Sequence, residues 1–200
     1  EYNFIAWERP FVLTTELFYK KLKDIIPYEV DNIRIRYFAD QKASGYSTGI
    51  DMKINGEFVK GIESWASLSI MKSAENIRYF VDSNGYLLSQ TDVNNGADYD
   101  HDTIIRGIPR PSDQRINFAI FFQDYIPFIP SFKVNLKLIF GTGLPFGPSE
   151  SERYTQKMRM TAYRRVDIGF SKQLIGGDNA MSFGPRNPLK FIRNCWLSLE

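Results

Sequence analysis

The sequence predicts an all-β fold: part of an antiparallel, up-and-down transmembrane β-barrel, with about eight strands of a larger barrel. The first observation behind this prediction is a strict two-residue alternation. Within Arg115–Asp124, the apolar side chains Ile116, Phe118, Ile120 and Phe122 occupy every second position. Because successive side chains of a strand point to opposite faces, such a segment has one apolar and one polar face. Its length fits a bilayer, since a spanning strand needs about 9–11 residues and an ordinary strand has about 5–6.

The second observation is that the connections between the predicted strands alternate in length. The short links are Lys21–Asp31, Gly56–Gly61 and Tyr125–Ser131, and the long ones are Ala74–Ser112 and Gly143–Tyr163. Outer-membrane barrels show this asymmetry, with short periplasmic turns and long extracellular loops. Two links depart from it: Ala39–Gly45 is short on the long side, and Leu174–Pro188 is long on the short side.

Each predicted strand sets apolar residues against polar ones with a period of two. In chain order the strands are Phe11–Lys20, Asn32–Phe38, Tyr46–Asn55, Ile62–Ser73, Arg115–Asp124, Phe132–Phe140, Arg164–Lys172 and the less regular Leu189–Glu200. One segment also suits a helix, because Thr14–Ile26 has apolar residues at near-helical spacing and Pro27 after its end. We keep the strand there because Phe11–Tyr19 alternates.

Aromatic residues lie near the ends of these strands, where a bilayer would place interfacial girdles. They are Trp7, Tyr19, Tyr37, Tyr46, Trp65, Tyr125 and Phe128.

Composition excludes several classes of protein. The 200 residues include 25 basic and 23 acidic side chains, interspersed along the chain, and the net charge of +2 gives no reason to expect a nucleic-acid partner. A single cysteine, Cys195, excludes a disulfide framework. The sequence has no apolar run long enough for a membrane helix and no export signal, so an exported protein would begin before Glu1.

Neither a catalytic site nor a metal or cofactor site is predicted. With one histidine and one cysteine, a zinc site or a histidine-dependent triad has few residues to draw on. The acidic stretch from Asp92 to Asp102 lacks the glycine position and closing glutamate of a helix-loop-helix calcium site, and a solvated loop is expected. Gly141, Gly143 and Gly147 are not followed by the Lys-Ser/Thr of a phosphate loop. We therefore expect no enzyme.

Several sequence blocks carry a family resemblance. They are Glu57–Gly61 (EFVKG) with Glu63–Trp65 (ESW), Pro109–Phe118 (PRPSDQRINF), Phe122–Tyr125 (FQDY), Phe140–Pro148 (FGTGLPFGP) and Tyr163–Gly169 (YRRVDIG). In this order they resemble consecutive barrel motifs of TonB-dependent outer-membrane receptors, in particular the group with an amino-terminal carboxypeptidase-like regulatory domain.

The resemblance implies a location, a function and partners. It implies a cell outer-membrane receptor that imports a scarce nutrient, such as a metal chelate, glycan or peptide, by TonB-coupled transport. The whole chain, 1–200, would be part of the β-barrel domain, which has about 22 strands in such receptors. The expected partners are outer-membrane lipid, the plug domain of the same full-length chain, and the TonB complex, which binds an amino-terminal segment absent here. No plug or regulatory domain is recognisable in the sequence.

The alternation then gives candidate ligand-binding residues on the polar face, which would line the lumen. They are Arg34, Arg36, Lys133, Lys137, Arg165 and Asp167. Arg165 and Asp167 are two residues apart and therefore point the same way, so they can pair with each other or with a plug. The alternative role of these charges is to satisfy one another and bound water.

Two other readings of the pattern stay open. One is a self-contained small outer-membrane barrel, an adhesin or pore. The other is a soluble, lipocalin-like ligand-binding barrel, whose apolar faces would point inward. In that last case Phe118, Leu136 and Ile168 would converge on a dry centre.

Overall fold

A computed structural model describes residues 1–31, 34–126, 128–148, 151–176, 192 and 194–199. The elements in these ranges are β1 (Tyr2–Ala6), β2 (Arg9–Ile25), β3 (Tyr28–Asp31), β4 (Arg34–Tyr37), β5 (Ala43–Val59), β6 (Ile62–Val81), β7 (Leu87–Leu88), α1 (Gln90–Asn94), β8 (His101–Pro109), β9 (Ile116–Ile126), β10 (Ile129–Gly141), β11 (Pro145–Phe146), the 3-10 turn η1 (Arg153–Thr155), β12 (Met158–Arg159), β13 (Tyr163–Ile175) and β14 (Cys195–Leu199).

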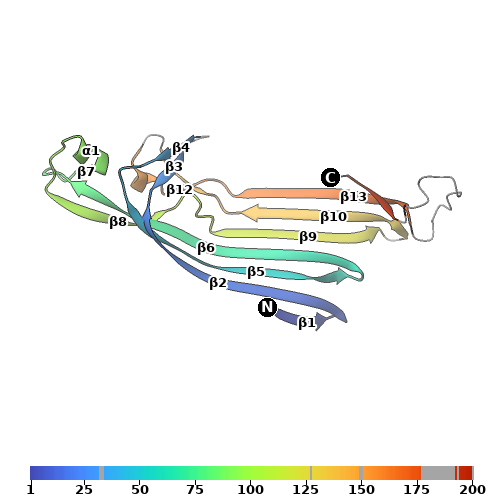
Figure 1. The fold of residues 1–200 in the computed structure, drawn as a ribbon. Helices are drawn as coiled ribbons and strands as arrows, with labels where there is room; N and C mark the ends of the chain where they lie inside the picture. Colours follow the sequence, from blue (N-terminus) through green and yellow to red (C-terminus); the bar gives the residue numbers. More distant parts are fainter. Residues whose placement is uncertain (32–33, 127, 149–150, 177–191, 193, 200) are drawn as a thin grey trace.

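The fold is all-β and antiparallel, and most of the strands belong to one large sheet. The order of the sheet is β1-β2-β5-β6-β9-β10-β13-β14, with β7 and β8 pairing with the extended end of β6. Figure 1 shows an open sheet of long strands with the two chain termini at its opposite edges. This up-and-down sheet is consistent with part of a barrel, and no closure occurs between the described strands.

The connections separate at the two ends of the sheet. At one end, the turn end, tight turns join β1 to β2 and β5 to β6. At the other, the loop end, lie the long connections that contain β3 and β4, then β7, α1 and β8, then β11, η1 and β12 (Figure 1). The predicted asymmetry of the connections is therefore present in the structure.

The pairing register keeps apolar side chains on one face across the sheet, because directly opposed residues share a face. One row runs Leu13, Ile54, Ala66, Ile120, Leu138 and Val166, and a second runs Leu17, Ile50, Ile70 and Ile116. We call this the apolar face. The opposite, polar face carries rows such as Glu16, Asp51, Ser69 and Asn117. A shift of one residue in the register of any strand pair would place polar side chains among the apolar ones.

The apolar face is not packed into a core. Leu17 is 78% exposed, Val166 60% and Ile168 56%. Phe118 and Leu136 are half-buried. Phe118, Leu136 and Ile168 therefore do not converge on a dry centre in this open sheet.

One predicted strand and one predicted link are wrong. Of Asn32–Phe38, residues Arg34–Tyr37 form β4, which pairs only with β3 in a separate two-stranded sheet. The first wall strand is β1, which pairs with β2 from Tyr2 to Ala6.

The predicted short link Lys21–Asp31 is also wrong, because β2 continues to Ile25 and its connection to β5 lies at the loop end. The segment Ala39–Gly45 is the last part of the long connection from β2 to β5, so it is no longer an exception to the asymmetry. The link Leu174–Pro188 and the start of Leu189–Glu200 fall largely outside the described residues.

The aromatic residues near the strand ends do not form one girdle. Tyr19 and Tyr46 stack on the apolar face with ring centroids 6.5 Å apart. Trp65 stacks on Phe121 on the polar face, at 6.4 Å, and Tyr37 lies on β4 outside the main sheet.

The small buried core lies at the loop end. Ala43, Ile77, Tyr79 and Ile108 form it, and Tyr154 of η1 packs against it. The loop that contains η1 thus covers the polar face of β6 at this end. In the described part of the chain no helix is long and apolar enough to cross a membrane.

Candidate functional site

Four of the predicted lumen residues lie where the sequence placed them, on the polar face of β10 and β13. Lys137 is directly opposite Asp167, and Arg165 donates from Nε to Asp167 Oδ1 at 2.8 Å. The pairing of Arg165 with Asp167 is therefore confirmed. Lys133 lies between two rings, with Nζ 5.0 Å from the Tyr125 centroid and 4.5 Å from that of Trp196. Such contacts hold the ammonium beside aromatic surface.

The other two predicted residues are not on the wall of the sheet. Arg34 and Arg36 belong to the β3–β4 hairpin at the loop end. Arg36 pairs through Nε with Glu29 Oε1 at 2.8 Å and also donates to the Ser151 carbonyl. The alternation of Asn32–Phe38 is real, but a side hairpin produces the same pattern as a wall strand.

A hollow of about 270 Å³ lies on the polar face, over β2, β5, β6 and β9. Glu16, Asp51, Ser69 and Asn117 form one row along its floor, and Thr14, Lys53 and Ser67 form the next. Ser69 Oγ donates to Asp51 Oδ1. The row offers carboxylate, hydroxyl and amide groups, which suit a hydrogen-bonding partner with donors.

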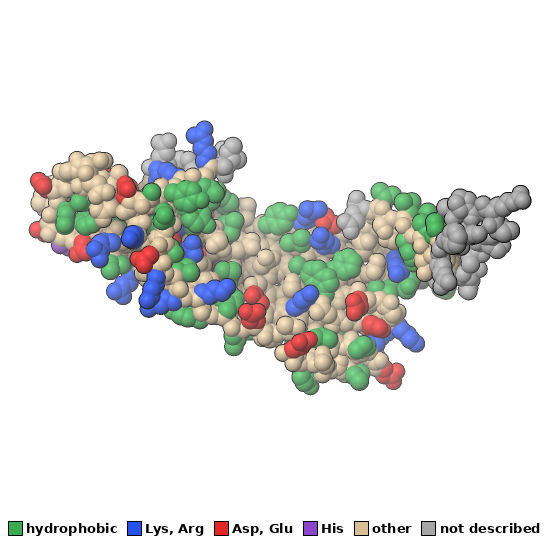
Figure 2. Space-filling view, viewed as in Figure 1, with side chains coloured by type: hydrophobic (Ala, Val, Ile, Leu, Met, Phe, Trp, Pro, Cys, Tyr) green, Lys and Arg blue, Asp and Glu red, His purple; other side chains and the backbone are tan. Residues whose placement is uncertain are grey.

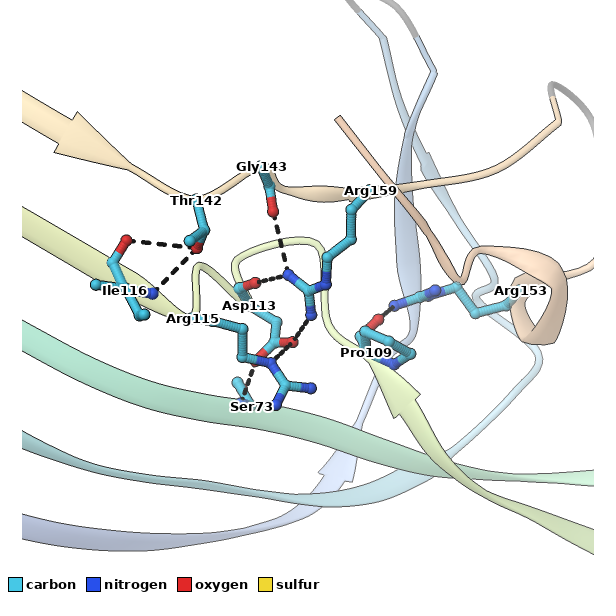
Figure 3. Close-up of polar contacts among 9 residues, drawn as sticks. All are labelled: Ser73, Pro109, Asp113, Arg115, Ile116, Thr142, Gly143, Arg153 and Arg159. Atoms are coloured by element: carbon cyan, nitrogen blue, oxygen red, sulfur yellow. Dashed lines mark hydrogen bonds and ion pairs between the residues drawn. The ribbon is translucent and has the colours of Figure 1, made fainter. Parts of the chain in front are cut away.

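The loop end contains a buried ionic network centred on Asp113 (Figure 3). Asp113 is fully buried, and its carboxylate accepts from Ser73 N at 2.6 Å and from Arg115 Nε at 2.8 Å. Arg159 donates to the same carboxylate and, from Nη1, to the carbonyl oxygens of Asp113 at 2.7 Å and Gly143 at 3.1 Å. One carboxylate thus joins β6, the segment before β9 and the loop after β10.

A second buried pair lies beyond the part of β6 that pairs with β9. Arg153 Nε is 2.9 Å from Glu75 Oε1, Arg110 Nε is 3.5 Å from Glu75 Oε2, and Arg153 also donates to the Pro109 carbonyl. Burial raises the pKa of the Glu75 carboxyl, and the two guanidinium groups oppose this effect. The same burial lowers the pKa of Arg153, which remains protonated because an arginine does not titrate in proteins.

A third contact connects the β3–β4 hairpin to the loop that contains η1. Gln156 Nε2 donates to Glu29 Oε2 at 2.8 Å, and both side chains are buried. The three groups of contacts fix the loops against the sheet.

Two of the sequence blocks that carry the family resemblance, Pro109–Phe118 and Phe140–Pro148, meet at the loop end of the sheet. Gln114 Nε2 donates to the Thr142 carbonyl at 3.1 Å, and the Ile116 amide donates to Thr142 Oγ1 at 3.0 Å. A Cβ on Gly143 would lie 1.7 Å from the Met160 carbonyl oxygen, so only glycine fits there. The residues of PRPSDQRINF and FGTGLPFGP therefore hold two loops together at the end of the sheet.

Sequence reasoning did not identify Glu29, Glu75, Asp113, Arg153 and Arg159 as a buried network. These residues lie in long predicted loops or where the two-residue alternation of a strand stops. Such positions do not reveal which distant residues will be their partners. Two residues of the acidic stretch have partners: Ser89 caps α1 while the Asp92 carboxylate accepts from the Ser89 amide, and Asp102 lies 3.4 Å from Arg78. Among the described residues no three His, Cys, Asp or Glu side chains are grouped as a metal site requires.

Comparison with protein-family models, with curated proteins and with solved structures finds no match for this chain.

Proposed function

We propose that the chain is part of the wall of a TonB-dependent receptor in the cell outer membrane, and that the receptor imports a scarce nutrient such as a metal chelate, glycan or peptide. The polar face would line the lumen and face a plug domain of the same full-length chain, and lipid would cover the apolar face. The chain itself would carry no catalysis.

The observation that best supports this proposal is the exposed apolar face. One of its rows passes from β2 to β13 and a second from β2 to β9 without a polar residue, yet Leu17, Ile70 and Val166 remain 43–78% exposed. Soluble proteins rarely expose an apolar patch larger than a few hundred Å². If lipid hydrocarbon covers the apolar face, these side chains are not exposed to water. The opposite face is then free to be polar because it faces the wet interior of the barrel.

The buried network suits long extracellular loops. Loops outside a membrane need internal contacts to keep one shape, and Asp113, Glu75 and Glu29 supply such contacts at the loop end. The sequence blocks described above add the resemblance to TonB-dependent receptors.

The test uses the full-length protein in its own cells. A strain without the gene is grown on a panel of iron chelates, glycans and short peptides as the limiting nutrient, beside the parent strain. We expect one nutrient to support only the parent, and its uptake to stop when an uncoupler collapses the proton-motive force. Uptake that continues without this force would contradict TonB coupling, and a protein absent from the outer-membrane fraction would contradict the proposal as a whole.

A further inference from the structure

The segment 151–157, which we call the η1 loop, lies against the β3–β4 hairpin at the loop end. Gln156 Nε2 donates to Glu29 Oε2 at 2.8 Å, and Arg36 donates to the Ser151 carbonyl. Glu152 stands between these two contacts in the sequence, directly after Ser151. The hairpin therefore holds the backbone on both sides of the Glu152 carboxyl.

The η1 loop also meets β6 and the segment 87–94, which contains β7 and α1 and which we call the α1 segment. Tyr154 of the η1 loop and Leu87 of the α1 segment pack against the same small core. Tyr154 also contacts Tyr79 of β6 edge to face, with 5.1 Å between ring centroids. Three separate parts of the loop end thus come together at the η1 loop.

One oxygen of the Glu152 carboxyl is shielded from water without a hydrogen bond. Oε2 has no hydrogen-bond partner among the described residues. An ionised carboxylate in such a position lacks both water and a donor, which is costly. The neutral carboxyl carries a smaller cost there, because no charge is removed from water.

The charges around Glu152 are mostly negative. The carboxylates of Glu29 and Asp92 act on it, and Arg36 is the opposing cation. Arg36 is already paired through Nε with Glu29 Oε1 at 2.8 Å. Figure 2 shows further acidic side chains around α1 and the nearby end of β8. An ionised Glu152 therefore adds a third carboxylate to a junction with one shared guanidinium.

The sign of the pH effect follows from this environment. Burial raises the pKa of the Glu152 carboxyl above its ordinary value of 4.5, the Asp92 charge raises it further, Arg36 lowers it and Glu29 raises it again. If the loops separate and water reaches Glu152, the pKa returns to its ordinary value. The closed arrangement therefore binds the proton more tightly. Its stabilisation is complete below about pH 4.5 and is lost as the pH rises through the raised pKa.

Other ionisable groups face Glu152 from β6 and from the η1 loop itself. Burial raises the pKa of Tyr79, and the charge of Glu152 adds to this effect, so the phenol stays neutral. Arg153 pairs with Glu75 at 2.9 Å. Burial also raises the pKa of Glu75, which titrates in the same direction as Glu152, so the test needs a variant of Glu152 alone.

We propose that Glu152 is an acid-operated latch: uptake of one proton by its carboxyl closes the η1 loop onto the α1 segment and the β3–β4 hairpin, and loss of the proton loosens all three. In the proposed receptor, the loops at the mouth of the lumen would close as the outside becomes acidic. The latch itself rests on the loop contacts alone and needs neither a particular nutrient nor TonB.

The test measures the distance between the η1 loop and the α1 segment in the full-length protein in lipid vesicles. Nitroxides are attached to cysteines at the exposed positions Lys157 and Asn95, just after the α1 segment, in a background without other cysteines. EDTA is present, so that no divalent cation takes the place of the proton. Double electron–electron resonance gives the populations at short and long distance. We expect the ratio of closed to open protein to rise several-fold from pH 8 to pH 5, since each unit of pKa shift changes such a ratio about tenfold.

Two variants separate the latch from a general effect of charge. Glu152→Gln imitates the protonated carboxyl and should show at pH 8 the closed population that the parent reaches only at pH 5. Asp98→Asn removes an exposed carboxylate of the same loop end and should keep the pH dependence of the parent. Glu75 is present in both variants, so its own titration does not distinguish them.

Three results would refute the latch: a parent ratio that does not change with pH, a Glu152→Gln variant that is no more closed than the parent at pH 8, or an Asp98→Asn variant that closes as Glu152→Gln does. A protein that imports its nutrient but fails this test refutes the latch alone and leaves the proposed function standing.

Discussion

At the scale of residues, the charged side chains of this chain have two different roles. Arg165 and Asp167 pair in the open on the polar face, where Arg165 is 56% exposed. Asp113 is fully buried and holds two arginines and a backbone amide. An exposed pair contributes little because water screens it, whereas removal of one partner from a buried pair is strongly destabilising.

The contrast gives a matched pair of substitutions. Asp113→Asn keeps the shape of the side chain but leaves Arg115 and Arg159 without their carboxylate. We expect it to weaken the attachment of the loop by about 2 kcal/mol, because hydrogen bonds to charged groups contribute about 1.5–3 kcal/mol each and both arginines retain some access to water. The measurement is the rate of protease cleavage within residues 142–162 on intact cells.

Asp167→Asn is the control, and its expected effect on the same cleavage rate is less than about twofold. Equal cleavage of the Asp113 and Asp167 variants would mean that the buried network does not hold the loop.

The sequence predicts the polar-face residues but not the buried network. Lys133, Lys137, Arg165 and Asp167 follow from a local rule, the alternation of a strand. Asp113 depends on Arg159, 46 residues away, and no local pattern contains that pairing.

At the scale of elements, alternation predicts strands well and their partners poorly. Each of the wall strands β2, β5, β6, β9, β10 and β13 overlaps a predicted segment. The segment Asn32–Phe38 alternates equally well, yet its described part pairs in a side hairpin, while the short β1 gives too weak a signal to be found. Pairing depends on where a connection leads, which periodicity does not contain.

The register itself can be tested by cross-strand disulfides. Ser69 of β6 is directly opposite Asn117 of β9, and directly opposed residues in an antiparallel pair lie within disulfide range, at about 4.5–5.5 Å between Cα atoms. In a Cys195→Ser background, we expect Ser69→Cys with Asn117→Cys to crosslink under mild oxidation, which is detected by mobility on a non-reducing gel.

The control combines Ser69→Cys with Phe118→Cys, whose side chains point to opposite faces. If the control pair crosslinks and the first pair does not, the register of β6 and β9 is displaced by one residue.

The two faces of β6 should respond differently to a new charge. Leu68 lies on the apolar face and Ser69 on the polar face. We expect Leu68→Arg to destabilise the membrane-inserted protein by about 2–4 kcal/mol, the cost of an arginine against lipid near the bilayer midplane. Urea unfolding in lipid vesicles measures it.

Ser69→Arg, one residue away, should cost less than about 1 kcal/mol because its side chain would enter a polar surface. A larger cost for Ser69→Arg than for Leu68→Arg would reverse the assignment of the faces.

At the scale of the whole molecule, the sheet is incomplete in two ways. Its edge strands β1 and β14 have no neighbour on one side among the described residues, and its apolar face has no protein cover. Unpaired edges and exposed apolar surface both favour association with further strands or with lipid. A larger barrel in a bilayer meets both requirements.

The central claim is that the apolar face contacts hydrocarbon and the polar face contacts water. The most direct measurement is a nitroxide scan of residues 64–72 on β6 in the full-length protein, reconstituted in lipid vesicles, with molecular oxygen and a water-soluble nickel chelate as relaxing agents. The account predicts a period of two, with oxygen access highest at positions 66, 68 and 70 and nickel access highest at 67 and 69. The opposite phase would contradict it, and so would the absence of any alternation.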